Sequence, residues 1–355
     1  MTIIGSQDVD TAVSLCTKAL QEVAHLDWTV PAAGLEWSCY DTAVHVAEDF
    51  TAYAAQLVVG AREGYVPLEV RADEGTTPDG LIEVITATGG FLSAVTAVAR
   101  PEARGWHPYG NAGADGFAAM GIVEVLLHTH DILVGLGVHG WEPGPELPLL
   151  VLDRLFPHVP RGNHAWRTLL WATGRGELPG LARKTVWRWY GDPVAAERVL
   201  LCPVFPVIAA DLAAGGTGGF DWAEDGPADG TRRAAGSVVK AHEEGRYRRG
   251  WTPYVIVRAS DRRAIGGMGF HAAPDADGRS EMGYDLVPSA RGNGYATEAL
   301  KALTGWAFRQ PGLTLLVAEV DEDNAASHAV VRRAGFTETG SGEGTVRYAL
   351  RSAGV

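Results

Sequence analysis

Residues 281–296 read EMGYDLVPSARGNGYA, and this stretch decides the fold of the C-terminal half. The apolar run at 282–287 predicts a short strand, which Pro288 ends because proline cannot donate to a sheet. Loop 291–296 follows, and apolar residues at helical spacing over 296–309 predict a helix directly after it. The sequence therefore predicts a strand, a glycine-containing loop and a helix in immediate succession.

The loop has the properties of a phosphate-binding turn. Gly292 and Gly294 leave the main chain open to close approach, and the amide groups at a helix start attract an anion. Two other phosphate loops fit less well. A P-loop needs Lys-Ser/Thr where this chain has Tyr295 and Ala296, and a dinucleotide loop lies early in a βαβ unit, not late in the chain. An ordinary turn before a helix is the remaining alternative.

The spacing Arg-x-x-Gly-x-Ala at 291–296 resembles the acetyl-CoA loop of the GCN5-related N-acetyltransferases (GNAT). Gly-Tyr at 283–284 and Thr-Glu-Ala at 297–299 resemble, more closely, the branch that acetylates the N-termini of ribosomal proteins. Asn-x-x-Ser at 324–327 and Arg-Ala-Gly-Phe at 333–336 also match the family's pattern. The resemblance therefore extends over the C-terminal half of the chain.

This resemblance implies an α/β acetyltransferase domain at 195–355 with a mixed, mostly antiparallel sheet. Alternating and apolar runs flank the loop in the order that the family requires. Strands are expected at 199–207, 254–257, 265–270 and 313–320, and helices at 220–225, 231–244 and 329–334.

In that family an amine attacks the thioester carbonyl of acetyl-CoA directly, and the resemblance implies a role for each matched position. The backbone of one strand segment would pair with the pantetheine arm: Tyr284, Asp285, Leu286 and Val287. The loop amides would bind the pyrophosphate: Arg291, Gly292, Asn293, Gly294, Tyr295 and Ala296. Asn324 would hydrogen-bond the pantetheine, and Ser327 would protonate the departing thiolate. For Ser327 the alternative is a simple helix N-cap.

A general base is also required, because a protonated amine cannot attack. Glu281, at the start of the central strand, is the first candidate. Asp285 and Glu298 are weaker candidates, and His271 and His328 are alternatives that no spacing favours. For each carboxylate the competing interpretation is a solvated surface group.

The first half of the chain predicts a different architecture. Apolar residues recur at three- and four-residue spacing over 9–24, 41–62, 80–99 and 117–135, and the joining segments are rich in glycine and proline. Four such helices in succession predict an all-α four-helix bundle, which we place at 1–194.

Within this bundle, Glu124 and His128 lie four residues apart and so share one helix face. His45 lies in the middle of the second predicted helix. Three Glu and His ligands from two inward faces suit a divalent metal with an open coordination position. His130 lies on a different face and is a weaker candidate. The competing interpretation of His45 is a hydrogen-bonded core histidine.

Other residues make this bundle resemble the DinB-like N-terminal domain of mycothiol-dependent maleylpyruvate isomerases. These are Asp-Trp-Thr-Val-Pro at 27–31, Trp-Ser at 37–38, Asp41 and Asp131. The resemblance implies that His45, Glu124 and His128 bind zinc or another divalent metal, and that a low-molecular-weight thiol takes part. Isomerase activity does not follow, because an acetyltransferase-like half stands where that enzyme has another C-terminal domain.

Charge and composition narrow the choice of partners. Residues 197–355 hold 18 Lys/Arg and 20 Asp/Glu, whereas the remainder holds 12 and 23, so that most of the net charge of −13 belongs to the helical half. An acidic bundle argues against nucleic acid and favours a cationic substrate such as an amine. The sequence suggests no signal peptide and no membrane span, and three widely separated cysteines suit a reducing cytoplasm.

Three functions from different classes remain open at this stage. The first, favoured by the glycine loop and Asn324, is an acetyl-CoA-dependent N-acyltransferase acting on a primary amine of a small molecule or peptide. The second is a metal- and thiol-dependent transferase or isomerase centred on the bundle. The third is a binding protein in which neither pocket turns over a substrate.

Overall fold

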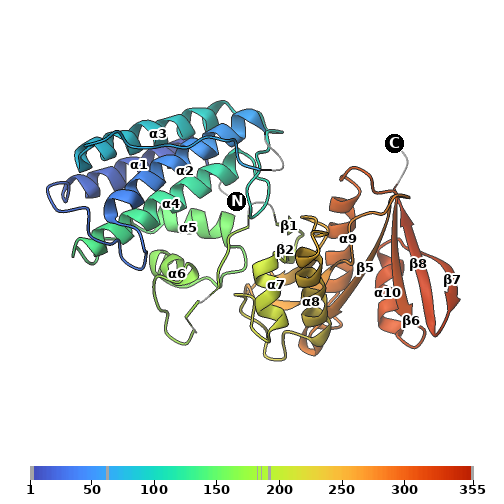
Figure 1. The fold of residues 1–355 in the computed structure, drawn as a ribbon. Helices are drawn as coiled ribbons and strands as arrows, with labels where there is room; N and C mark the ends of the chain where they lie inside the picture. Colours follow the sequence, from blue (N-terminus) through green and yellow to red (C-terminus); the bar gives the residue numbers. More distant parts are fainter. Residues whose placement is uncertain (1–3, 61–63, 182, 185, 191–192, 353–355) are drawn as a thin grey trace. The chain divides into compact units, whose positions relative to one another are not determined.

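The computed structural model describes residues 4–60, 64–181, 183–184, 186–190 and 193–352. The chain divides into two compact units (Figure 1). The helical unit comprises Met1–Pro157, Gly162–Lys184 and Arg188–Asp192, and the C-terminal unit comprises His158–Arg161, Thr185–Trp187 and Pro193–Val355. The predicted boundary at 194/195 lies close to the last point of this division, Asp192/Pro193. Two short segments before it, His158–Arg161 and Thr185–Trp187, belong to the C-terminal unit.

The helical unit is built on four long helices that pack against one another, followed by two short ones (Figure 1). Their bounds are α1 Ser6–Gln21, α2 Cys39–Val59, α3 Pro78–Val98, α4 Ala114–Gly135, α5 Glu146–Leu155 and α6 Ala165–Ala172. The short helices α5 and α6 were not predicted. The end predicted for the second helix, residue 62, lies outside the described residues. Whether this unit belongs to the DinB-like family stays a prediction.

Local sequence determines where the long helices begin and how closely they pack. The Ser38 hydroxyl accepts a hydrogen bond from the Asp41 amide and caps α2, and Thr77 caps α3 in the same way ahead of a proline at the first helical position. A Cβ on Gly121 of α4 would lie 2.4 Å from Leu92 of α3. Glycine at this position therefore permits the close approach of two helices.

Two helices of this unit correct the expectation that no segment approaches a membrane span. By length and composition alone, α3 and α4 are apolar enough to cross a membrane. In the most apolar window of α4, 83% of the residues are buried inside the protein, and in that of α3 the share is 44%. Core helices meet the same criterion, and α4 is apolar on nearly every face because other helices surround it.

The C-terminal unit contains one sheet with strand order β1-β2-β3-β4-β5-β6-β8-β7 (Figure 1). The strands are β1 Val194–Ala195, β2 Val199–Pro203, β3 Pro253–Arg258, β4 Ala264–Phe270, β5 Arg279–Leu286, β6 Leu315–Asp321, β7 Thr337–Gly342 and β8 Thr345–Arg351. The helices are α7 Pro206–Ala213, α8 Asp229–Glu243, α9 Tyr295–Ala307 and α10 Ala325–Arg333. Among the eight strands of the described residues, β5 and β6 are the one pair that runs parallel, so the prediction of a mixed, mostly antiparallel sheet is confirmed.

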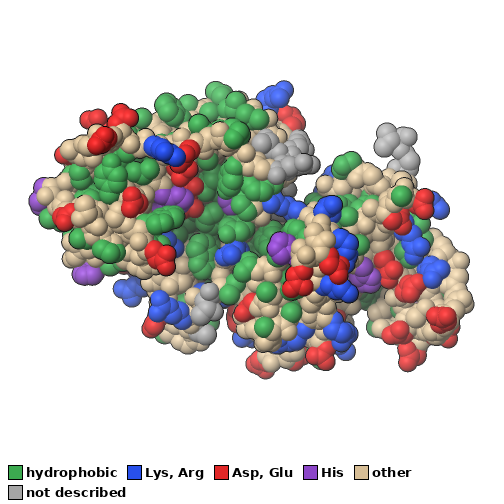
Figure 2. All heavy atoms as spheres, in the orientation of Figure 1, with side chains coloured by type: hydrophobic (Ala, Val, Ile, Leu, Met, Phe, Trp, Pro, Cys, Tyr) green, Lys and Arg blue, Asp and Glu red, His purple; other side chains and the backbone are tan. Residues whose placement is uncertain are grey.

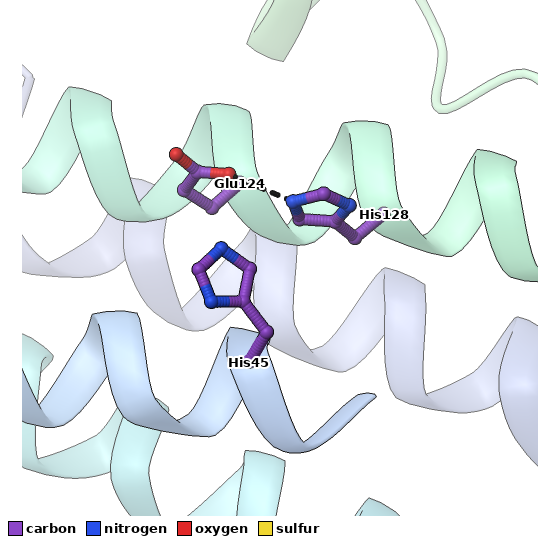
Figure 3. A group of neighbouring side chains, drawn as sticks. All are labelled: His45, Glu124 and His128. Atoms are coloured by element: carbon purple, nitrogen blue, oxygen red, sulfur yellow. Dashed lines mark ion pairs between the residues drawn. The ribbon is translucent and has the colours of Figure 1, made fainter. Parts of the chain in front are cut away.

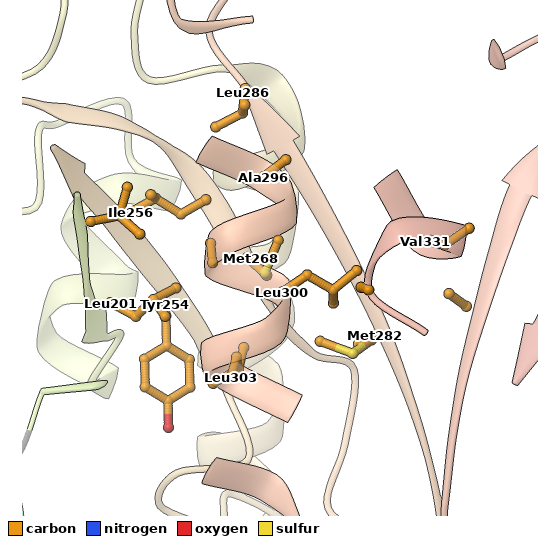
Figure 4. Packing of buried hydrophobic residues seen from close by; sticks show 14 of the residues in the cluster. Leu201, Tyr254, Ile256, Met268, Met282, Leu286, Ala296, Leu300, Leu303 and Val331 are labelled. Atoms are coloured by element: carbon orange, nitrogen blue, oxygen red, sulfur yellow. The ribbon is translucent and has the colours of Figure 1, made fainter. Parts of the chain in front are cut away.

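The parallel pair β5/β6 opens along its length. Residues 279–281 of β5 pair with residues 315–317 of β6, and the pairing stops at Glu281 and Val317 although both strands continue. Figure 4 shows the two strands diverging beside α9. The later part of β5 therefore has a free edge on the β6 side, where an extended ligand can add as a further strand.

Opposite faces of β5 meet different helices, because successive side chains alternate. Met282 and Leu286 pack with Leu300 of α9 in the hydrophobic core of this unit (Figure 4). Asp285 points the other way and bonds Thr231 of α8. The central strand thus separates an α9 face from an α8 face.

Two predictions for this unit were wrong in detail. Residues 220–225 form no helix, and the first helix is α7, in the apolar stretch predicted as a continuation of the first strand. Pro206 at the first turn starts α7 and cannot continue a ladder. Strands β1, β7 and β8 were not predicted; in β7 all six residues are exposed and give no apolar alternation.

Charge is distributed differently over the two units. On the visible face of the C-terminal unit acidic and basic side chains are interspersed, whereas the visible face of the helical unit shows broader hydrophobic areas (Figure 2).

The three cysteines are free and buried. Burial raises the pKa of the Cys16 thiol to about 12 and that of Cys39 to about 11, so neither supplies a thiolate near neutral pH.

Candidate functional site

The glycine loop is shaped to present amide groups from the start of α9. Gly292 and Gly294 adopt φ of +75° and +80°, values that side-chain-bearing residues rarely adopt. Gly294 is the N-cap and no side chain caps the first turn. The amides at this helix start are therefore available to an anion, and the dipole of a thirteen-residue helix favours negative charge there.

Arg198, in the turn between β1 and β2, fastens this loop. Its guanidinium donates to the Asn293 carbonyl at 3.1 Å and forms a 2.7 Å ion pair with Glu298 of α9. The Arg198 amide also donates to Glu298. Glu298, a weaker candidate for the base, is thus occupied in holding the loop. Sequence analysis missed Arg198 because a hundred residues separate it from its partner.

The register of β5 against β4 limits which backbone groups of residues 284–287 can pair with pantetheine. The amides of His271 and Val287 donate to Glu281 and Ile265 respectively, so odd-numbered residues of β5 bond β4. The backbone groups of Asp285 and Val287 therefore face β4, and those of Tyr284 and Leu286 face the open edge. Arg291 Nε donates to the Leu286 carbonyl at 3.1 Å, which leaves Tyr284 as the freest backbone contact for pantetheine.

Asp285 has a structural role. Its carboxylate accepts from the Thr231 amide at 2.6 Å, the Thr231 hydroxyl at 2.7 Å and the Gly267 amide at 2.9 Å. These bonds tie α8 to the sheet. A carboxylate so fully engaged does not suit the work of a general base.

Tyr284 and Ser327 meet across the opening between β5 and α10. The Tyr284 hydroxyl donates to Ser327 Oγ at 2.8 Å. Asn324 is the N-cap of α10 and accepts from the Ser327 amide at 3.0 Å, so Ser327 is not the cap. Burial raises the pKa of Tyr284, although its bond with Ser327 opposes this shift. The pair therefore stays protonated and can supply a proton. The Tyr284 hydroxyl was not predicted as a site group.

Glu281 and His271 form a second pair on the α8 face of the sheet. His271 Nδ1 lies 3.3 Å from Glu281 Oε1, and both side chains are partly exposed. A Cβ on Gly283 would lie 3.2 Å from His271 Nε2, so this glycine makes room for the imidazole. His328, by contrast, is held by the Tyr348 hydroxyl at 2.9 Å and the Glu322 carbonyl at 3.3 Å.

A cavity of about 420 Å³ opens on this same face. Its walls come from α8, β3, β4 and β5, and include Trp251, Met268, Phe270, His271 and Tyr284. The Arg233 and Arg248 side chains also line it. The cavity thus extends from an apolar wall to the imidazole of His271, and Ser327 is not among its lining residues.

Comparison with known proteins agrees with this geometry. Residues 217–337 match the acetyltransferase (GNAT) domain family. The C-terminal unit carries a GNAT acetyltransferase domain. The uncharacterized N-acetyltransferase YoaA of Bacillus subtilis is 34% identical over 85 residues, which are 24% of this chain and 48% of that protein. YjdG of the same organism is 31% identical over 88 residues, which are 25% and 52%.

The chain spans about half the length of these relatives. Among solved structures, the acetyltransferase of Salmonella typhimurium that modifies the N-terminal serine of ribosomal protein L7/L12 is 21% identical over 45% of this chain and 99% of its own, with a TM-score of 0.34. The ribosomal L7/L12 α-N-protein acetyltransferase RimL in complex with coenzyme A is 20% identical over 45% and 98%, with a TM-score of 0.33. Similarity at these scores does not bear on function.

Outside the acetyltransferase domain, the helical unit brings the three predicted metal ligands together (Figure 3). One donor atom from each of His45, Glu124 and His128 lies within 4.8 Å of the other two. His128 Nε2 lies 3.1 Å from Glu124 Oε2, and both side chains are almost buried. His130 packs instead on Trp166, with ring centroids 5.6 Å apart, and belongs to no such group among the described residues.

A second layer of groups surrounds these three. His128 Nδ1 lies 3.2 Å from Asp131, and Arg175 binds the same carboxylate through two nitrogens. Tyr53 donates to Glu124 Oε1 at 3.4 Å. Such outer contacts orient ligating side chains. A buried imidazole between two carboxylates, with its ring centroid 5.3 Å from that of His45, fits a divalent metal by the chemistry of its donors.

The charge on His128 gives the metal-free protein a distinct pH dependence. Burial alone would lower the pKa of His128, but the carboxylates of Asp131 and Glu124 raise it to about 9. In the unfolded chain the pKa of a histidine is about 6.5. Protonation therefore stabilises the fold fully below about pH 6.5, and this contribution is lost as pH rises through about 9.

We expect the free energy of unfolding in EDTA to fall by about 3 kcal/mol between about pH 6.5 and 9.5, measured by urea denaturation. The other groups of the chain also titrate, so the comparison is with His128→Gln, in which the decline should be much smaller. Equal pH dependence in the two proteins contradicts the prediction.

Proposed function

We propose that the C-terminal unit is an acetyl-CoA-dependent N-acyltransferase that acetylates a primary amine of a small molecule or peptide by direct attack on the thioester. The observation that carries this proposal is the combination of an uncapped helix start at Gly294 with a free strand edge at Tyr284. The amides from Gly292 to Ala296 would hold the pyrophosphate, since the Arg291 amide already donates to the Pro288 carbonyl at 3.2 Å, and the β5 edge would align the pantetheine.

Two proton transfers accompany the reaction. The amine nitrogen forms a bond to the carbonyl carbon of the thioester, the carbon–sulfur bond breaks, and the thiolate leaves. We propose that the Ser327 hydroxyl protonates the thiolate. The Tyr284 hydroxyl would replace the lost proton on Ser327 through their 2.8 Å hydrogen bond. We assign removal of the amine proton to Glu281, with His271 3.3 Å away to share it.

This assignment places acid and base on opposite sides of β5. Ser327 belongs to the opening beside α10, and His271 lines the cavity beside α8. A thioester laid along the free edge would therefore meet an amine arriving from the cavity. The apolar wall at Trp251 and Phe270 favours an acceptor with an apolar body, and Arg233 and Arg248 favour one that also carries a carboxylate.

The direct test is an assay of coenzyme A release from acetyl-CoA against a panel of amines, with and without Zn²⁺. The panel should pair each apolar amine with its α-carboxylate analogue, and free amino acids with short peptides. Turnover of at least one amine, with the acetylated product identified by mass spectrometry, supports the proposal. Binding of coenzyme A without transfer to any amine would favour a binding protein.

We expect Ser327→Ala to lower kcat by about 100-fold, since general acid catalysis contributes on the order of 100- to 10,000-fold. Tyr284→Phe should lower kcat by less, because Ser327 remains. The KM for acetyl-CoA should change little in both, as measured by initial rates. Ser341→Ala is the matched control, because this exposed serine of β7 belongs to none of the proposed site groups. A normal kcat for Ser327→Ala would remove Ser327 from the mechanism.

A second proposal concerns the helical unit. We propose that His45, Glu124 and His128 bind a divalent first-row metal, supported by the 4.8 Å grouping of their donor atoms. When bound, such an ion would act as a Lewis acid toward a ligand in its open position. The metal- and thiol-dependent transferase or isomerase stays the alternative function, and no contact described above favours either reaction.

A further inference from the structure

Asp49 is a buried carboxylate beside the proposed metal ligands that no role assigned so far requires. It lies one helical turn after His45 on α2, and its side chain is 16% exposed. Its Oδ2 atom is fully buried and receives no hydrogen bond of acceptable geometry. An unsatisfied buried carboxylate oxygen is costly, so its retention calls for an explanation.

The surroundings of Asp49 offer too little positive charge to compensate it. His45 Nε2 lies 3.2 Å from its Oδ2 atom, and of the other groups that act on its charge, Glu124 and Glu48 are acidic and His128 is basic. Arg175, the buried cation of this region, is engaged with Asp131. A divalent cation at this point would reverse that balance.

The distance between Asp49 and His45 agrees with ligation of one ion by both residues. Two donors that each lie about 2.0–2.2 Å from one ion, at tetrahedral or octahedral angles, are about 3.0–3.5 Å apart. Asp49 Oδ2 lies 3.2 Å from His45 Nε2, and Glu124 Oε2 lies 3.1 Å from His128 Nε2. In Figure 3 one ring nitrogen of His45 points toward Glu124 and His128. The other nitrogen, Nδ1, lies 3.9 Å from the more exposed Glu48.

We propose that Asp49 is a fourth protein donor, which makes the centre a set of two histidines and two carboxylates. This inference rests on the proposed metal site. Adding a second carboxylate makes the donor set harder, and so favours Mn²⁺ or Fe²⁺ more than a site of two imidazoles and one carboxylate does. It also fills the fourth position of a tetrahedral ion, so an open position requires a five- or six-coordinate metal.

The experiment titrates the metal-free full-length protein with Mn²⁺ and with Zn²⁺ by calorimetry, and records the visible spectrum of the Co²⁺ form. Asp49→Asn should weaken Mn²⁺ binding by at least about 10-fold, and Zn²⁺ binding by less. The Co²⁺ bands should change in intensity as one ligand is lost. Glu48→Gln is the matched control: it removes the same charge from the adjacent residue and should leave affinity and spectrum unchanged.

The outcomes separate the two proposals. Failure of the wild type to bind any of the three ions overturns the metal site itself, and with it the role of Asp49. Binding by the wild type with unchanged affinity and Co²⁺ spectrum in Asp49→Asn overturns only the fourth donor. Equal losses in Asp49→Asn and Glu48→Gln would show a general effect of charge and also overturn it. Circular dichroism of each variant verifies that the helices persist.

Discussion

Replacement of Gly294 by tryptophan is expected to reduce kcat/KM for acetyl-CoA by at least about 100-fold, mainly through a higher KM. Gly294 has φ of +80°, which strains any other residue, and its Cβ would project near Arg198, which fastens the loop. The indole would also occupy the approach to the amides that start α9. Steady-state kinetics with varied acetyl-CoA, and direct binding of coenzyme A, measure the effect.

The matched control is Gly312→Trp. Gly312 has φ of +86° in the same unit and has open space around its Cβ, so it suffers similar backbone strain far from the glycine loop in sequence. The midpoint temperature of thermal unfolding should fall by similar amounts in the two variants, whereas only Gly294→Trp should lose coenzyme A binding. Unimpaired acetyl transfer by Gly294→Trp would show that the loop is not the cofactor site.

Substitution of His45 by alanine should weaken divalent metal binding by more than about 100-fold, because loss of an outer-shell partner alone costs about 10- to 100-fold. His45 comes from α2, whereas Glu124 and His128 both come from α4, so its removal leaves ligands from a single helix face. Metal content after dialysis and calorimetric titration measure the loss. Acetyl transfer by the C-terminal unit should persist, since its proposed groups all belong to other elements.

His130→Ala serves as the control for this substitution. His130 lies on α4 two residues from a proposed ligand and packs on Trp166, so the change removes an imidazole without touching the group. It should retain metal. If His45→Ala retained the ion as well as His130→Ala does, the assignment of the ligands would be wrong.

Local patterns in the sequence were sufficient for much of the C-terminal unit. The alternation in β3 and β4 and the glycine loop before α9 predicted neighbouring elements within a few residues of their observed bounds. These signals are local, because side-chain periodicity and the φ requirement of glycine act over one element. Strand β7 and the shift of the first helix to α7 escaped prediction, since neither shows the expected apolar spacing.

The contacts that support the proposed roles of the site residues were harder to predict from the sequence. The sequence left Ser327 as either a helix N-cap or a proton donor. The structure places Asn324 at the cap and the Tyr284 hydroxyl beside Ser327, and these contacts support the proposed role of Ser327 as proton donor. Glu298 and Asp285 were candidate bases until Arg198 and Thr231 proved to bind them. Asp49 had a local signal, its four-residue spacing from His45, that points to the same helix face.

Sequence patterns alone predicted the glycine loop before a helix, the Glu and His residues on helical faces, and the division into an acidic helical half and an α/β half. Each depends on neighbours within one or two turns. The folded arrangement was needed to show that β5 separates from β6 after Glu281, that other groups already bind Asp285 and Glu298, and that His45 of α2 lies beside the Glu124–His128 pair of α4. Those properties depend on pairs far apart in the chain, whose distances arise when helices and strands pack, and no local pattern encodes them.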